Sequence, residues 1–96
     1  MVYVISLEKL TDLRLNLWSH DVLGVVSSEG LVPKVLFDLT LEQFPQFADV
    51  VDLDTIFSRL TYEFLHREDN SYFKYVVESN GEFNGSFYVE LIPKLD

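Results

Sequence analysis

One stripe of apolar residues constrains the fold of this 96-residue chain more than any other feature. Its members recur at i, i+3, i+4, i+7 and i+11, and they are Leu53, Ile56, Phe57, Leu60 and Phe64. Such spacing is typical of an amphipathic helix that buries one side, so we expect a helix over residues 53–67. Asp52 or Asp54 can cap its first turn by accepting hydrogen bonds from free backbone amides. Glu63 and Arg67 have the i, i+4 spacing of a surface ion pair.

A β-hairpin is predicted to follow over residues 71–92. A two-residue turn at Asn80 and Gly81 would mix polar and apolar side chains on both faces, because a slip of one residue exchanges the faces of a strand. A loop longer by one residue places Ser79 opposite Phe83 and puts the polar and the apolar side chains on separate faces. One face then holds Phe73, Tyr75, Val77, Phe87, Val89 and Leu91, and the other holds Tyr72, Lys74, Glu78, Ser86, Tyr88 and Glu90. We therefore predict an odd loop of three or five residues.

The first thirty residues give mixed signals. Residues 2–6 are rich in strand formers and predict a first strand. The leucines that follow fit both a helical and a strand period, and we expect a helical turn over residues 7–11 and a strand over 13–18. Residues 21–29 fit neither period, so a short helix and the middle strand of a meander both stay open.

Prolines set the expectations for the middle of the chain. A strand is predicted over residues 32–39, beginning at Pro33 or lying at a sheet edge, because proline cannot donate a hydrogen bond to a ladder. Residues 40–43 have the pattern of a capping box. Pro45 would clash inside a helix opened there, so we expect a new short helix to start at Pro45.

Together these elements predict a single small α+β domain over residues 1–96. A chain of this length is too short for two independent cores. The 48% hydrophobic content is far above that of disordered chains. The long helix must bury its stripe, and the predicted strands supply the partner. We expect a mainly antiparallel sheet with the 53–67 helix packed on it and the 71–92 hairpin at its C-terminal end.

The sequence offers little catalytic chemistry. It contains no cysteine, which excludes disulfides, thiolate metal sites and cysteine nucleophiles. Glycine-rich phosphate loops and Gly-x-Ser-x-Gly elbows are absent from it. His20 and Asp21 are adjacent and point to different sides of a strand or helix, so Asp21 is poorly placed to orient the imidazole of His20. Glu63 and His66 have the spacing of half a di-metal site, but the second copy that such a site needs is missing. We predict no enzyme activity, no cofactor and no metal.

Charge is the most informative bulk property of the sequence. Seven Lys and Arg stand against sixteen Asp and Glu, for a net charge of −9. The basic residues are dispersed singly, at Lys9, Arg14, Lys34, Arg59, Arg67, Lys74 and Lys94. Binding to nucleic acids or anionic membranes is therefore disfavoured. A cationic protein partner is favoured instead. The alternative, to which we give equal weight, is that the acidic residues only keep the chain soluble.

Candidate binding residues come from the polar face of the hairpin and from the start of the long helix. Tyrosine is enriched at protein interfaces, and two tyrosines share this face with two glutamates. Three aspartates at the helix start either complement the helix dipole or receive Lys and Arg from a partner. The predicted set is Tyr72, Tyr88, Glu78, Glu90, Asp49, Asp52 and Asp54.

In its general character the chain resembles bacterial immunity proteins and phage-type inhibitors, which neutralise basic nucleases or nucleic-acid-binding proteins. Residues 13–18 and 69–73 resemble strands of ribonuclease-type colicin immunity proteins. The resemblance implies a non-catalytic inhibitor or immunity protein, and it transfers no residue role. Residues 1–6 have no basic region before an apolar stretch, unlike a secretory signal, and no apolar run approaches about 18 residues, so we expect the cytoplasm.

Two other classes of function stay open. The chain could be a structural or regulatory subunit that associates by β-strand addition or as a homodimer. It could also be a small metal-dependent enzyme that uses Glu63 and His66.

Overall fold

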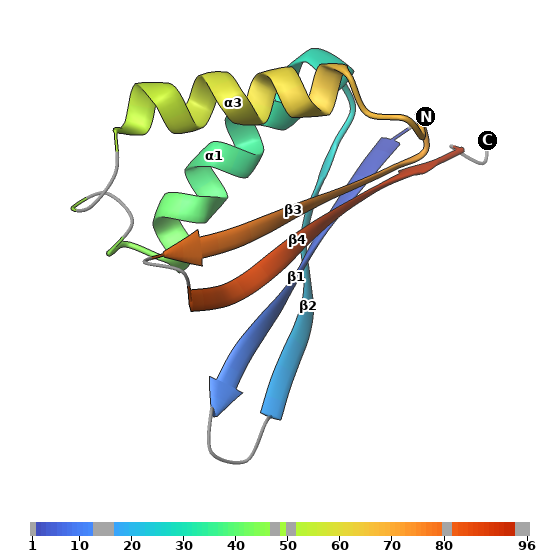
Figure 1. Cartoon of the computed structure of the whole chain (residues 1–96). Coiled ribbons are helices and arrows are strands. Elements are labelled where there is room, and N and C mark those ends of the chain that lie inside the picture. Colours follow the sequence, from blue (N-terminus) through green and yellow to red (C-terminus); the bar gives the residue numbers. More distant parts are fainter. Residues whose placement is uncertain (1, 13–16, 47–48, 50–51, 80–81, 94–96) are drawn as a thin grey trace.

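The computed structural model describes residues 2–12, 17–46, 49, 52–79 and 82–93. In chain order the elements are β1 (Val2–Asp12), β2 (Leu17–Val26), the 3-10 turn η1 (Glu29–Leu31), α1 (Val32–Gln43), α3 (Leu53–Leu65), β3 (Tyr72–Ser79) and β4 (Glu82–Ile92). The strands of this part of the chain form one antiparallel sheet of order β2-β1-β4-β3. Both α1 and α3 lie on the same side of the sheet (Figure 1). The predicted α+β class is confirmed.

The core fills the space between the helices and the covered face of the sheet. Its members are Tyr3, Ile5, Leu7, Val26, Val32, Leu36, Phe44, Leu60, Phe64, Phe73, Val77, Phe87 and Val89. Phe64 of α3 is fully buried, and its ring forms T-shaped pairs with Phe73 at 5.3 Å and with Tyr3 at 6.3 Å between centroids. Aromatic pairs of this geometry add to the stabilisation that burial alone provides. Phe64 therefore ties the long helix to β1 and β3.

Helix α3 confirms the helix predicted from the apolar stripe. Asp52 is its N-cap, and the carboxylate accepts hydrogen bonds from the amides of Asp54 and Thr55 and from the Thr55 hydroxyl. The Thr55 hydroxyl and then its amide lower the pKa of Asp52. The predicted pairing of Glu63 with Arg67 is wrong. Glu63 bonds Arg59 at 3.0 Å, and Arg67 reaches Glu29 at 3.3 Å.

Strand β1 continues through the residues for which a helical turn was predicted, so the expectation over residues 7–11 is wrong. Leu7 pairs with Asp21 of β2 and with Phe87 of β4, and this two-sided pairing outweighs the local helical period. Two residues on, the ammonium of Lys9 donates to the Gln43 carbonyl at 3.3 Å. Most of the strand predicted over 13–18 lies outside the described residues, and β2 begins at Leu17.

A bulge in β2 explains why residues 21–29 fitted neither period. Ile5 lies opposite Gly24, whereas the next residue, Ser6, lies opposite Val22. Leu23 is the additional residue, and such an insertion shifts the alternation of side chains along a strand. Residues 21–26 therefore belong to a strand, and both Val22 and Val25 face away from the helices.

Residues 32–39 form helix α1, and the predicted strand is wrong. Pro33 lies in the first turn, where its missing N–H has no helical partner to lose. Lys34 and Asp38 bond across one turn at 2.9 Å. The capping-box pattern at residues 40–43 does not start a helix, because Thr40 lies inside α1 and its hydroxyl donates to the Leu36 carbonyl. The short helix expected from Pro45 falls largely outside the described residues.

The hairpin of β3 and β4 has the predicted separation of faces. Phe73 pairs with Val89 and Val77 with Gly85. The expected loop length is wrong, because Ser79 pairs with Glu82 instead of Phe83. The additional residue is Asn84, and it forms a bulge inside β4.

Gly85, beside this bulge, allows β1 and β4 to come close together. A Cβ atom there would lie 2.7 Å from the Glu8 carbonyl oxygen and 3.1 Å from the Phe44 ring. Real Cβ atoms do not come that close to a backbone oxygen. Any side chain at position 85 would therefore push the two central strands apart.

Candidate protein-binding surface

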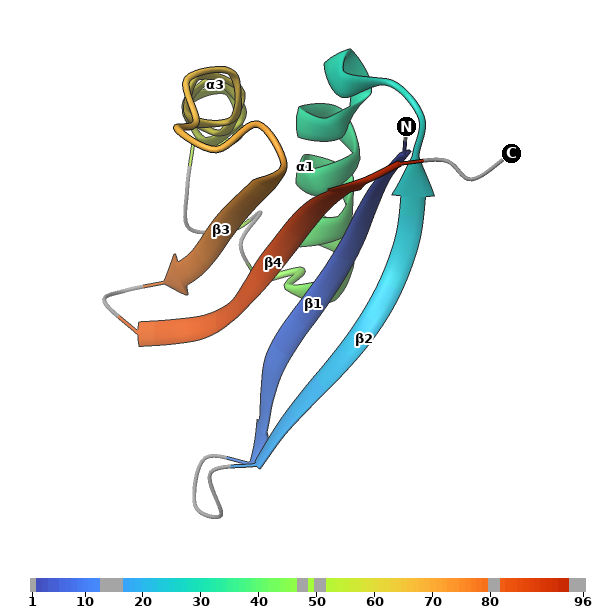
Figure 2. The same ribbon diagram turned by 90° about the vertical axis from the view of Figure 1, so that its right-hand side faces the viewer.

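The sheet has a second face, which the helices leave uncovered, and we call it the open face. Figure 2 shows the sheet from the side opposite α1. Strand pairing arranges the open face in three rows across β2, β1, β4 and β3. The rows are Val25, Val4, Glu90 and Tyr72; Val22, Ser6, Tyr88 and Lys74; and His20, Glu8, Ser86 and Val76.

Tyr88 is the centre of an aromatic cluster on the open face. Its ring stacks with His20 at 5.9 Å and lies 6.3 Å from Tyr72, measured between centroids. The Lys74 ammonium lies 5.7 Å from the centre of the same ring, a cation–π distance. Residues from β2, β3 and β4 thereby meet over one side chain.

Two serines lie beneath this cluster. Ser6 pairs with Tyr88 across the strands, and Ser86 precedes Tyr88 by two residues on the same face. Ser6 and Ser86 are 7% and 1% exposed. Their small side chains leave room for the larger neighbours to lie across the sheet. The Ser86 hydroxyl has no hydrogen-bond partner among the described residues, an arrangement that costs stability.

Apolar side chains on the same face are exposed to solvent. Val22 and Val25 of β2 are 67% and 60% exposed, and Val76 of β3 is 39% exposed. Carboxylates lie between them, and Glu8 approaches the His20 ring nitrogen at 3.9 Å. The open face thus combines apolar area, aromatic rings and acidic groups, which are the components of protein-binding surfaces.

The structure divides the predicted binding residues into two groups. Tyr72, Tyr88 and Glu90 lie together on the open face, and Glu78 extends the same face at the end of β3. The three aspartates do not join them. Asp52 and Asp54 belong to the start of α3, and Asp49 precedes it, so all three lie in the helix layer.

Sequence reasoning missed three residues of the open face. The sequence drew attention to His20 only beside its neighbour Asp21, whereas the structure stacks it on Tyr88. Val22 and Val25 have three-residue spacing, and the Leu23 bulge turns both to the open face. The strand formers around Gly24 could have predicted a strand there, but their spacing does not show where a bulge lies.

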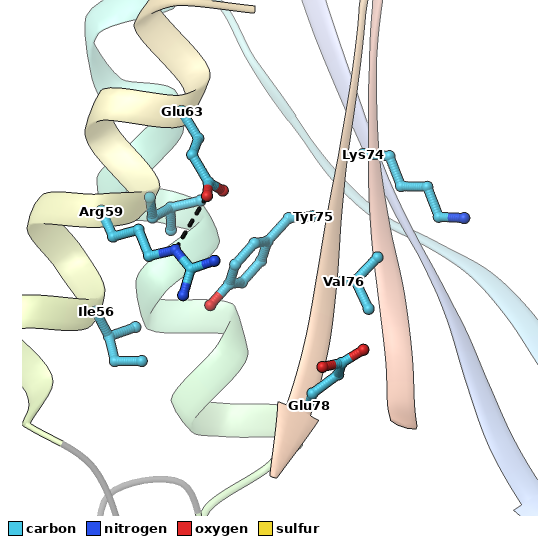
Figure 3. Close-up of a pocket in the computed structure, with 8 residues that line it drawn as sticks. Ile56, Arg59, Glu63, Lys74, Tyr75, Val76 and Glu78 are labelled. Carbon is cyan, nitrogen blue, oxygen red and sulfur yellow. Dashed lines mark hydrogen bonds and ion pairs between the residues drawn. The ribbon is translucent and has the colours of Figure 1, made fainter. Parts of the chain in front are cut away.

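A groove between α3 and β3 is a separate feature, and we call it the α3–β3 groove. Its volume is about 480 Å³, and its walls are Ile56, Arg59, Leu60 and Glu63 of α3 and Lys74, Tyr75, Val76 and Glu78 of β3. Figure 3 shows Tyr75 pointing toward Arg59 and Glu63, whereas Lys74 and Val76 point away from the helix. Burial and the Glu63 carboxylate raise the pKa of Tyr75, and Arg59 partly opposes them.

The two residues of the metal-dependent alternative have separate partners. Glu63 is bonded to Arg59. The His66 ring stacks on Tyr62 at 4.1 Å, and its Nδ1 lies 2.9 Å from the Tyr62 carbonyl oxygen. Within the described ranges, no group of three His, Asp or Glu side chains could hold a metal ion. No described helix has the length and apolar character required to cross a membrane.

Comparison of the chain with protein-family models, with curated proteins and with solved structures yields no match.

Proposed function

We propose that this chain is a non-catalytic binding module whose open face docks a cationic protein surface. The observation that carries the proposal is the aromatic cluster around Tyr88, set among carboxylates on a sheet face that the helices leave free. A net charge of −9 accelerates the encounter with a basic partner. Aromatic area then provides affinity at short range, because tyrosine buries a large surface and loses little side-chain entropy on binding.

The partner class that fits best is a basic nuclease or another nucleic-acid-binding protein. Such proteins concentrate Lys and Arg where they neutralise phosphates, and an acidic surface can occupy the same positions. Bound there, Glu8 and Glu90 would pair with cations while Tyr72 and Tyr88 contact their apolar stems. The chain would then act in the cytoplasm as an inhibitor or immunity protein.

A matched pair of double variants tests this proposal. Tyr88→Ala with Glu90→Lys alters the open face, and Tyr62→Ala with Glu68→Lys makes the same chemical change on and just after α3. Tyr62 is 63% exposed, so the control should fold normally. Each tagged protein is used to capture partners from the source cells at about 50 mM and about 500 mM salt, a range over which exposed charges become strongly screened. The captured protein is then purified for binding measurements.

The proposal predicts that one basic protein binds the unaltered chain and the α3 control at low salt and not at high salt. The open-face variant should bind this purified protein at least about tenfold more weakly, since interface tyrosines and paired charges contribute 1 kcal/mol or more each. Equal binding by the two variants would contradict the assignment of the open face. Binding that survives high salt would contradict the charge-based recognition.

A further inference from the structure

Strand β3 is an edge of the sheet that the described residues form, and the register shows which of its backbone groups point away from β4. The Leu91 amide donates to the Ser71 carbonyl at 2.8 Å, so this opposing pair is hydrogen-bonded. Hydrogen-bonded pairs alternate with non-bonded pairs along an antiparallel ladder. Phe73, Tyr75 and Val77 therefore direct their N–H and C=O groups toward β4. The alternate residues, Lys74 and Val76, direct theirs to the free edge.

This edge borders the α3–β3 groove. Near the start of β3 the helix and strand are in contact, because Phe64 meets Phe73 at 5.3 Å. Toward the end of β3 the two elements diverge (Figure 1). Figure 2 shows α3 beyond β3, on the side away from β4. One extended chain can enter between them, whereas a second folded copy paired along β3 would meet α3.

We propose that the α3–β3 groove binds an extended peptide segment of a partner protein, which adds to β3 as a further antiparallel strand. The backbone of the segment would satisfy the free N–H and C=O groups of Lys74 and Val76. Recognition of this kind occurs where an edge strand is flanked by side-chain pockets. The Lys74 side chain does not screen the edge, because its ammonium lies over Tyr88 on the open face.

The walls of the groove define the side chains of the segment. Along β3, Lys74, Val76 and Glu78 point to the open face, so the residues opposite them should be acidic, apolar and basic. The intervening residues point into the groove, where the partly buried Ile56 supplies apolar contacts. In an antiparallel segment the pattern from N- to C-terminus is basic, apolar, apolar, apolar and acidic. This recognition shares Lys74, Val76 and Glu78 with the open face, but it does not rest on the function proposed for that face.

Titration of the isotope-labelled full chain with synthetic peptides tests the proposal by NMR. The first peptide has a Lys-Val-Val-Val-Glu core with Gly and Ser flanks. A second carries N-methyl groups on the two amides that would face β3, which removes the donors and leaves the side chains intact. The third has the reversed core, Glu-Val-Val-Val-Lys. We expect the first to shift the Lys74 and Val76 amide signals, to protect those amides from exchange, and to bind at least about fivefold more tightly than either control.

A charge exchange in the chain tests the predicted order of charges with the same peptides. Lys74→Glu with Glu78→Lys should reverse the preference, so that the reversed core binds better. Lys34→Glu with Asp38→Lys exchanges an exposed pair on α1 and should leave the preference unchanged. The proposal is overturned if the Lys74 and Val76 signals do not respond, if the methylated peptide binds equally well, or if the preference fails to reverse. It is also overturned if sedimentation shows a dimer of the chain that the peptide does not dissociate.

Discussion

The two faces of the same sheet differ in how tightly their side chains are specified. On the covered face, Ile5, Val77 and Phe87 are fully buried and share one core cluster with residues of the helices. On the open face, the neighbouring residues include valines that are more than half exposed. Because side chains alternate along a strand, one backbone serves both surfaces. The covered face fixes the fold, and the open face can change its side chains at little cost in stability.

The largest loss of stability is expected from a substitution at the centre of the covered face. Phe64→Ala should lower the free energy of unfolding by about 3–5 kcal/mol, because it removes a fully buried ring and leaves a cavity. Leu65→Ala, one residue further on α3 and 57% exposed, should cost much less. Urea denaturation of both variants measures the difference. Similar losses for the two would show that α3 does not pack on the sheet as described.

A smaller loss is expected where the two central strands come closest. Gly85→Ala should destabilise the fold by about 1–3 kcal/mol, as overpacking does in tight sites, because the new methyl group would overlap the Glu8 carbonyl. Gly24→Ala is the matched control, since a Cβ atom there has no neighbour within 4 Å. Thermal unfolding compares them. If both alanines were tolerated equally, the close approach of β1 and β4 would be refuted.

The aromatic cluster should contribute modestly to folding. Tyr88→Ala is expected to cost roughly 1 kcal/mol, the scale of aromatic pair interactions, while Tyr88→Phe keeps the ring and should unfold like the unaltered chain. Chemical denaturation followed by fluorescence gives both values. A loss as large as that of Phe64→Ala would mean that the open face belongs to the core and is not available for binding.

The smallest effect is expected at adjacent valines that face opposite ways. Val25→Ser should change the free energy of unfolding by less than about 0.5 kcal/mol, as substitutions at exposed positions do. Val26→Ser should cost about 2 kcal/mol, because Val26 is buried and the new hydroxyl would lack a partner. Equal effects from these neighbours would contradict the opposite orientation of Val25 and Val26 in β2.

The sequence predicted the elements that are stabilised by interactions between residues close together in the chain. The stripe that includes Leu60 and Phe64 and the cap at Asp52 identified α3, because helical spacing and capping act within a few residues. The faces of the hairpin followed from alternation alone. The sequence did not show where the additional residue of the hairpin lies. An additional residue in the loop and one at Asn84 give the same separation of polar and apolar faces.

The wrong expectations arose where long-range pairing or a neighbouring element decides the structure. Residues 7–11 have leucines at helical spacing, yet pairing with two strands makes them extended. Pro33 suggested the start of a strand, although the i, i+4 spacing of Lys34 and Asp38 already favoured a helix. Neither the stacking of His20 on Tyr88 nor the α3–β3 groove could be predicted, because both join residues more than ten positions apart through the tertiary fold.

The strand order also has a consequence for how the chain folds. The central pair of the sheet joins β1 to β4, which lie at opposite ends of the described sequence. Contacts of such large sequence separation slow folding, because a long loop must close before they form. During translation, the hairpin of β1 and β2 is made first and must wait for β4 with its inner edge unpaired. We therefore expect the sheet to close, and the core to form, only after β4 has left the ribosome.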